Sequence, residues 1–150
     1  MNKRHCLKLV SGFVLALGLS TAAMAADTPA TLAGVKVIGA ADAKKMLDSG
    51  VPLIDTRVAA EYVEKTIKGA RNVPYKEKSA KDATFDASQD QFDLGKLPSD
   101  KTAPLVLFCN AGECWKSYKA SVVASKAGYT KISWFRGGMP EWVAAGLPTQ

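Results

Sequence analysis

Two cysteines, Cys109 and Cys114, lie five positions apart in the stretch CNAGECWKS and are the residues best suited to covalent chemistry. The sequence has one histidine, His5, near its start, so neither thiol has an evident imidazole as general base. A strand-like run, PLVLFC, ends at Cys109, and a glycine-bearing turn and a helix-like segment follow it. Any group that activates a thiol here is therefore expected in the turn and the helix.

The turn after Cys109 is expected to ionise its thiol. Backbone N–H groups of such a turn and of a helix N-terminus point toward an anion, and Lys116 and Lys119 add positive charge nearby. Both effects favour the thiolate and lower its pKa without a histidine. The sequence therefore predicts Cys109 as a nucleophile in a cradle of backbone amides. The residues expected to form the binding loop are Asn110, Ala111, Gly112, Glu113, Trp115, Lys116 and Ser117.

Three roles are open to Cys114. It can form a structural disulfide with Cys109, although closing so short a loop contributes little entropic stabilisation. It can form a reversible bridge by attacking a persulfide or sulfenic acid on Cys109, which releases sulfide or protects the thiol. It can also be inert at a buried helix start. The reversible role is the prediction we favour.

The first 25 residues have the features of a cleavable secretory signal. Three basic residues precede an apolar stretch at 9–19, and small residues at 23–25 suit cleavage after Ala25. The apolar stretch is shorter than the roughly 18 to 20 residues that a membrane-spanning helix needs. We therefore expect a periplasmic or secreted protein with no stable membrane association after cleavage, in a compartment where disulfides persist.

Signal cleavage would change the charge and chemistry of the chain. It would remove Cys6, the sole histidine and three cations but no carboxylate, so the formal net charge would fall from +6 to +3. The remaining lysines are scattered among acidic residues, which argues against a nucleic-acid partner. Without histidine or a spaced Cys/His cluster, the mature sequence predicts no metal site.

Strand-like and helix-like segments alternate through the rest of the chain. A small polar stretch, 26–34, is expected to be a flexible lead-in, and one domain is expected over residues 35–150. Such alternation is typical of an α/β fold, here with a central parallel five-stranded sheet, helices on both faces and the site at the carboxyl ends of the strands. The expected strands are 35–38, 51–57, 70–74, 104–109 and 131–135, and the expected helices are 40–50, 59–64, 116–128 and 138–146.

The connection from 75 to 103 is long and polar for a compact domain. Its charges suit a solvated face, and Phe85, Phe92 and Leu94 are candidate anchors to the core. Connections of this length tend to be either functional or loosely ordered, so the segment is also a candidate lid.

Several motifs, in order, resemble those of the single-domain rhodanese family. The segment VPLIDTRVAAEY with IKGARNVP resembles its N-terminal half, PLVLFC through GLP resembles its catalytic half, and the resemblance covers about 35–148. The positions that match are Asp55, Arg57, Glu61, Tyr62, Ile67, Gly69, Ala70, Cys109, Gly112, Gly137, Gly138, Trp142, Gly146 and Pro148.

The resemblance implies sulfur transfer through Cys109. Its thiolate would attack the outer sulfur of a donor such as thiosulfate, become a persulfide and pass that sulfur to a thiol or to cyanide. The implied partners are a small sulfur-containing anion and a thiol acceptor, and no metal or organic cofactor is implied. Asp55, Arg57 and Lys119 are expected as supporting residues, with Asp55 in an ion pair and hydrogen-bond network beneath the loop.

The sequence departs from the family at the loop and near Thr66. Cys114 stands where the family often has an arginine. Lys116 or Lys119 could supply the missing charge, but a lysine ammonium cannot form the bidentate hydrogen bonds of a guanidinium, so thiosulfate is expected to be a poor donor. Thr66 replaces a usual histidine. The stretch CWKS is similar to a subgroup of secreted rhodanese-like proteins with a Cys-Trp signature, in which Trp115 would either wall the sulfur site or pack in the core.

Three rival functions are weighed against sulfur transfer. A phosphatase would need Cys-x5-Arg, but Trp115 occupies the arginine position. A thiol-disulfide oxidoreductase would use Cys109 and Cys114, although their spacing is not Cys-x-x-Cys. A non-catalytic module would use the loop to bind a partner or a small anion.

Overall fold

The computed structural model describes residues 26–150, so the predicted signal, 1–25, lies outside the described residues. Five parallel strands form one sheet in the order β1-β5-β4-β2-β3. The strands are β1 (Lys36–Ile38), β2 (Leu53–Asp55), β3 (Arg71–Asn72), β4 (Leu105–Phe108) and β5 (Ile132–Phe135). The helices are α1 (Ala40–Asp48), α2 (Ala59–Glu64), α3 (Trp115–Lys126) and α4 (Gly138–Ala144), with short 3-10 turns η1 (Ala87–Gln89) and η2 (Leu94–Lys96). The predicted α/β class with a five-stranded parallel sheet is confirmed.

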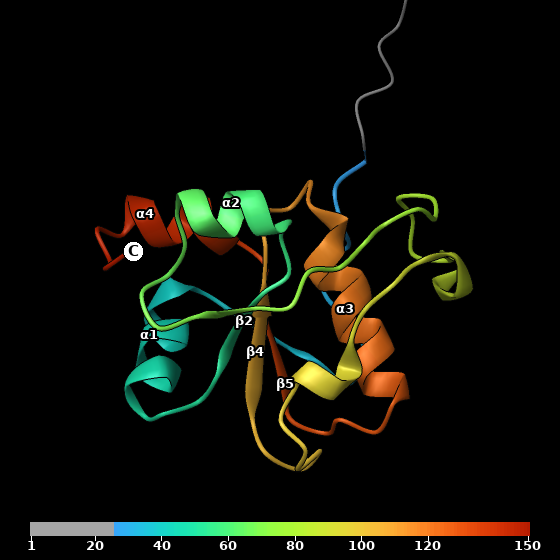
Figure 1. The fold of residues 1–150 in the computed structure, drawn as a ribbon, viewed down its shortest axis with the longest axis horizontal. Helices are drawn as coiled ribbons and strands as arrows, with labels where there is room; N and C mark the ends of the chain where they lie inside the picture. The colour runs from blue at the N-terminus through green and yellow to red at the C-terminus, as the bar shows by residue number, and fades with distance from the viewer. Residues whose placement is uncertain (1–25) are drawn as a thin grey trace, which may run out of the picture.

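The side chains of β4 alternate between two cores. Leu105 and Leu107 pack in the core beneath α3, whereas Val106 and Phe108 pack in the core beneath α1 and α4. Successive residues of a strand point to opposite faces, and all four are fully buried, so this strand lies at the centre of a three-layer structure. Figure 1 shows α1 and α4 on one side of the sheet and α3 with the long connection on the other.

The helices begin and end close to the predicted positions. Gly50 and Gly128 follow α1 and α3 with φ of +83° and +98°, a backbone conformation that favours glycine and ends a helix. Helix α3 begins at Trp115, directly after its N-cap residue Cys114, which lies close to the predicted start. The loop that carries both cysteines is thus held between the end of β4 and the first turn of α3.

Two segments outside the regular elements are also held against the domain. In the long connection, Phe85, Phe92 and Leu94 pack partly buried against the α3-side core, as predicted. The expected flexible lead-in, 26–34, differs from the prediction because its Thr28 is buried and hydrogen-bonded to the cysteine loop. No helix within the described part of the chain is long and apolar enough to cross a membrane.

Candidate functional site

The backbone of Cys109 is fixed at the carboxyl end of β4. Thr56 donates hydrogen bonds from its backbone N–H and its hydroxyl to the Phe108 carbonyl, at 3.0 and 2.9 Å. The backbone N–H of Met139 donates to the Cys109 carbonyl at 2.9 Å. This approach requires Gly138, whose φ is +53° and where a Cβ would collide with the Cys109 carbonyl oxygen. The glycine at the start of α4 therefore allows the helix to hold the Cys109 backbone.

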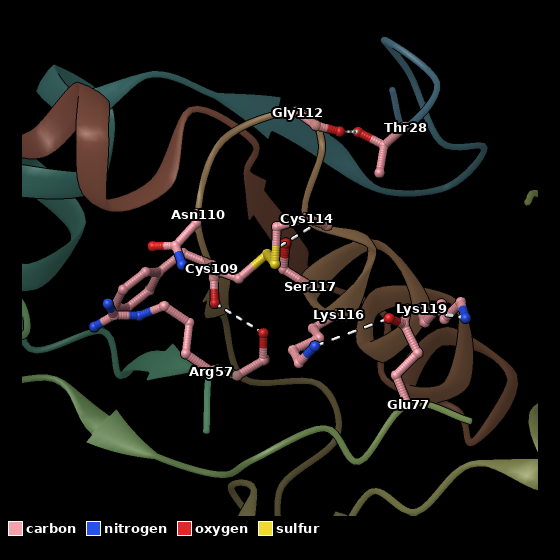
Figure 2. Close-up of a disulfide and its surroundings, with 12 residues drawn as sticks. Thr28, Arg57, Glu77, Cys109, Asn110, Gly112, Cys114, Lys116, Ser117 and Lys119 are labelled. Carbon is pink, nitrogen blue, oxygen red and sulfur yellow. Dashed lines mark hydrogen bonds and ion pairs between the residues drawn. A yellow bond between two sulfur atoms is a disulfide. The ribbon is translucent and has the colours of Figure 1, made fainter. Parts of the chain in front are cut away.

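Cys109 and Cys114 are joined by a disulfide, with their Cα atoms 6.3 Å apart (Figure 2). Between them, Ala111 turns the chain with a φ of +38°. The structure therefore brings the two predicted thiols together at the start of α3 and excludes an isolated, inert Cys114. The sulfur of Cys109 faces α3 because its side chain continues the alternation of Leu105 and Leu107.

The surroundings of the Cys109 sulfur differ from the predicted amide cradle. Within residues 26–150, the polar groups in contact with this sulfur are the Ser117 hydroxyl, at 3.0 Å, and the Cys114 carbonyl oxygen, at 3.2 Å. The backbone amides of the turn do not donate to it in this disulfide-bonded form. The Ser117 hydroxyl favours negative charge on the sulfur, whereas the carbonyl oxygen opposes it.

Ser117 is oriented by Trp134, a core residue of β5. The indole Nε1–H of Trp134 donates to the Ser117 oxygen at 2.9 Å, and both residues are at most 1% exposed. Because a disulfide sulfur carries no hydrogen, the Ser117 hydroxyl is the donor to Cys109 while its oxygen accepts from the indole. Ser117 is one of the predicted loop residues, whereas its contact with Trp134 was not predicted.

Lys116 and Lys119 were expected to supply positive charge to the Cys109 sulfur. In the structure both form ion pairs with Glu77, which corrects that prediction. Lys119 is fully buried, and its Nζ lies 2.9 Å from Glu77 Oε2 and 2.8 Å from Ser79 Oγ. Lys116 Nζ lies 3.8 Å from Glu77 Oε1, and Figure 2 shows the two side chains facing each other. Burial of an ammonium requires a paired carboxylate, so Glu77 neutralises the charge before it can act on the thiol.

Asp90 lies in the same long connection as Glu77, 75–103, and is held by a separate set of hydrogen bonds. Burial by itself raises the pKa of Asp90, but hydrogen bonds from the Ser79 hydroxyl and backbone, the Lys78 backbone and the Tyr75 hydroxyl outweigh it and lower the pKa to about 2. Burial and the bond to Asp90 raise the pKa of Tyr75. The prediction that charges in 75–103 form a solvated face is thus wrong for Glu77 and Asp90, which tie the connection to α3.

Asp55 and Arg57 form the predicted supporting network beneath the loop. Arg57 donates to both carboxylate oxygens of Asp55, with the shortest contact 2.7 Å from Nη2, and Asp55 is fully buried. Thr66, which replaces a family histidine, donates its hydroxyl to Asp55 at 2.8 Å. The same guanidinium donates to the Lys65 carbonyl at 2.6 Å, so it links β2 to the end of α2 and does not touch the sulfur.

A cavity of about 330 Å³ borders the cysteine loop at Asn110, and neither cysteine lines it. Its lining includes Arg57 and Asn110, and the Asn110 amide donates to Glu61 at 2.6 Å. Successive side chains of an extended segment point in opposite directions. Asn110 directly follows Cys109, so its side chain points toward α2 and α4, away from the disulfide. The remaining lining residues are Glu61, Glu64, Lys65, Met139, Pro140 and Val143.

The segment 26–29, which we call the N-terminal strap, crosses the cysteine loop. Thr28 donates its backbone N–H and hydroxyl to the Gly112 carbonyl at 2.8 and 2.7 Å, and the Trp115 indole donates to the Ala26 carbonyl at 2.8 Å. Arg136 donates to the Thr28 carbonyl and hydroxyl and to the Pro29 carbonyl. Trp115 is 3% exposed and packs in the core, so it does not wall an open site.

Sequence reasoning missed the contributions of the strap and of Glu77, Asp90 and Trp134. Their partners lie far away in the sequence, and no spacing rule connects Thr28 with Gly112 or Glu77 with Lys119. A usable signal existed only for Trp134, because strand alternation places it on the α3 side with Ile132. Glu113 is exposed. Over residues 26–150, no cluster of three or more His, Cys, Asp or Glu side chains is placed to hold a metal ion.

Two of the related proteins are described as thiosulfate:glutathione sulfurtransferases. A thiosulfate:glutathione sulfurtransferase from Saccharomyces cerevisiae is 33% identical over 100 residues, which cover 66% of this chain and 69% of the yeast protein. The protein of the same description from Homo sapiens is 31% identical over 113 residues, which cover 75% of this chain and 96% of the human protein. The relatives therefore match along most of the described domain.

Solved structures share the fold. A crystal structure of a protein from Anabaena sp. superposes with a TM-score of 0.55 at 22% identity, covering 75% of this chain and 90% of that one. A thiosulfate sulfurtransferase from Pseudomonas aeruginosa superposes with a TM-score of 0.58 at 17% identity, covering 77% of this chain and 20% of that longer one. Residues 39–145 match the rhodanese-like domain. By this domain and its sulfurtransferase relatives, the chain belongs to the rhodanese-like family.

Proposed function

We propose that this protein is a periplasmic sulfurtransferase that carries a sulfane sulfur as a persulfide on Cys109. The observation that supports this most strongly is the position of Cys109, at the carboxyl end of the central strand and beside the Ser117 hydroxyl, in a rhodanese-like chain. The donor is a small sulfur-containing anion such as thiosulfate, and the acceptor is a thiol or cyanide. The predicted signal, 1–25, supports the periplasmic location.

The reduced protein is the form that accepts sulfur. In the disulfide-bonded form, Cys109 is 1% exposed and its sulfur is already bonded. Reduction frees a thiolate that receives a hydrogen bond from Ser117. The thiolate attacks the outer sulfur of the donor, sulfite leaves from thiosulfate, and the acceptor thiolate later takes the terminal sulfur.

Thiosulfate is expected to be a slow donor. The loop lacks an arginine, and the nearby lysines pair with Glu77. Arg136, although close to Gly112, donates to the carbonyls of the N-terminal strap. A dianion therefore meets little uncompensated positive charge at the cysteine loop, which supports a donor of lower charge in the cell.

Intact-mass measurement of the reduced protein tests sulfur transfer. After incubation with thiosulfate and removal of excess donor, the Cys114→Ser variant should gain the mass of one sulfur atom, located on Cys109. The matched Cys109→Ser variant should gain none. Failure of the Cys114→Ser variant to gain sulfur, while circular dichroism shows it folded, would refute the proposal.

A thiol-disulfide redox protein is the second candidate, and the disulfide itself favours it. In that case the purified protein should exchange electrons with a dithiol at equilibrium but take up no sulfur from thiosulfate. A redox titration against dithiothreitol, followed by the mass measurement above, separates the two functions.

A further inference from the structure

The two cysteines of the disulfide differ in their exposure to solvent. Cys109 is 1% exposed, whereas Cys114, the N-cap residue of α3, is partly exposed. Exchange requires an incoming thiolate to approach one of the two sulfurs directly. Access from solvent therefore selects Cys114 as the residue that is attacked.

The environment of Cys109 suits it to be the leaving group. When Cys114 is attacked, the electron pair of the broken bond moves to the Cys109 sulfur, 3.0 Å from the Ser117 hydroxyl. The Trp134 indole holds that hydroxyl in place. A sulfur whose thiolate is stabilised leaves faster, so accessibility and charge stabilisation select the same direction of exchange. The Cys114 carbonyl, 3.2 Å from the same sulfur, opposes this charge in the closed form.

We propose that Cys114 is the sulfur attacked by an external dithiol and the residue that later expels sulfide from Cys109. The protein would then use the electrons of a dithiol to reduce the sulfane sulfur that it accepts. Sulfide release rests on the proposed sulfurtransferase function, whereas the direction of disulfide exchange does not depend on it.

The reaction balances in four steps. One thiolate of the dithiol bonds to Cys114 and displaces the Cys109 thiolate. The second thiolate of the same dithiol then attacks the dithiol sulfur that is bonded to Cys114. The bond to Cys114 breaks, the dithiol departs as a cyclic disulfide, and Cys114 becomes a free thiol. Cys109 next takes the outer sulfur of thiosulfate and releases sulfite. Finally, the Cys114 thiolate attacks the inner sulfur of the persulfide, re-forms the bridge and releases hydrosulfide, so the dithiol is oxidised and the sulfane sulfur is reduced by the same two electrons.

The loop explains why a dithiol is required. The two Cα atoms are 6.3 Å apart in the closed loop, so the freed Cys109 thiolate stays beside a mixed disulfide on Cys114. An intramolecular attack is strongly favoured by proximity, so Cys109 would expel a simple monothiol and restore the bridge. A dithiol escapes this reversal because its own second thiol also attacks intramolecularly.

The direction of exchange is tested first, without thiosulfate. The oxidised protein is mixed with 2-mercaptoethanol and, at short times, with a larger excess of N-ethylmaleimide, which alkylates the freed thiol before the bridge re-forms. The peptide that holds both cysteines is then fragmented in the mass spectrometer. The expected adduct carries 2-mercaptoethanol on Cys114 and the alkyl group on Cys109. The opposite arrangement, or an even mixture, would overturn the inference.

Sulfide release is tested with the native protein, dithiothreitol and thiosulfate. Catalytic amounts of protein should release hydrosulfide and sulfite in equal amounts, with the dithiol oxidised. In a single turnover without dithiothreitol, the reduced native protein should release hydrosulfide. The reduced Cys114→Ser variant should release none and should retain the persulfide on Cys109.

The outcomes separate failure of this inference from failure of the proposed function. If Cys114→Ser forms the persulfide but the reduced native protein, freed of dithiothreitol, releases no more sulfide than that variant, the role of Cys114 is wrong and sulfur transfer stands. If neither protein takes up sulfur, the proposed function fails, and the adduct position alone decides the direction of exchange.

Discussion

Ser117 is the residue on which activation of Cys109 depends most directly. The indole of Trp134 fixes its hydroxyl, and the hydroxyl lies 3.0 Å from the sulfur inside the α3-side core. A hydrogen bond to a charged group in a buried site contributes more than one to a neutral group. The thiolate of Cys109 therefore depends on a side chain, in the place where the sequence indicated backbone amides.

Removing that hydroxyl should slow the chemistry of Cys109. In a reduced Cys114→Ser background, Ser117→Ala should lower the rate of Cys109 alkylation at neutral pH by about tenfold or more, since a hydrogen bond to a charged group contributes about 1.5–3 kcal/mol. The measurement is the alkylation rate as a function of pH. Ser121→Ala is the matched control, because Ser121 is equally buried one turn along α3 but donates only to the Ser117 carbonyl. Equal rates in both variants would contradict the assigned role.

At the scale of elements, the start of α4 at Gly138 fixes the position of the first residue of the cysteine loop. The Met139 N–H reaches the Cys109 carbonyl only because Gly138 has no Cβ. Helix α4 thereby connects the carboxyl ends of β4 and β5, and the loop cannot move without the turn.

Gly138→Ala should therefore destabilise the fold by about 3 kcal/mol or more, because a left-handed φ and a collision with backbone act together. Urea unfolding measures the loss. Gly34→Ala is the control, since Gly34 has a φ of +74° but open space around its Cα, and it should cost about 1 kcal/mol. Similar losses of unfolding free energy in the two variants would show that the close approach of Gly138 to Cys109 does not contribute to stability.

The N-terminal strap is the second element that restrains the loop. Arg136 binds it through the carbonyls of Thr28 and Pro29, while Thr28 binds the Gly112 carbonyl. The guanidinium also packs against Gly112, where a Cβ would lie 2.7 Å from Nη2. The strap, the arginine and the loop should therefore loosen together.

Arg136→Ala should release the strap while the domain stays folded. The backbone N–H of Thr28, which donates to Gly112 at 2.8 Å, should lose most of its protection in hydrogen exchange. Arg71→Ala, at an exposed position of β3, should leave that protection unchanged. Retained protection in Arg136→Ala would mean that the Thr28 bonds hold the strap unaided.

At the scale of the whole molecule, two buried networks hold the loops that surround the sheet. Asp55 and Arg57 connect β2 with the end of α2, and Asp90 with Glu77 connects the long connection with α3. The first network is closed within residues 55–66, whereas the second joins residues 77–90 to Lys119, far along the chain. The stability of the domain should accordingly depend on their charge states.

Acid should weaken the protein through Asp90. Its pKa is lowered to about 2 in the folded state, against about 3.9 when unfolded, so its stabilisation is present above about pH 4 and is lost as pH falls toward 2. Asp90→Asn should cost on the order of 2 kcal/mol at neutral pH and flatten the pH dependence of the unfolding free energy in this range. The exposed Asp42→Asn is the control for urea unfolding at several pH values. A variant with native stability at pH 7 would contradict this account.

The local features of the chain were readable from the sequence. Strand β4 and the cysteine that follows it were predicted from a continuous apolar run, and helix ends from glycines such as Gly50 and Gly128. The parallel direction of the strands was predicted from the alternation of strands and helices, but their order in the sheet was not. The pairing of Asp55 with Arg57 spans two residues and was also accessible. These features depend on short-range sterics and on periodicity, which a sequence displays directly.

By itself, the sequence determined the fold class, the position of Cys109 and the supporting role of Asp55. Only the tertiary structure decided that Lys119 is neutralised by Glu77, that Ser117 with Trp134 contacts the sulfur, and that the strap covers the loop. The physical reason is that a side chain's charge and donors act on whatever lies within a few ångströms. Those neighbours are selected by packing of distant segments, which residue spacing does not record.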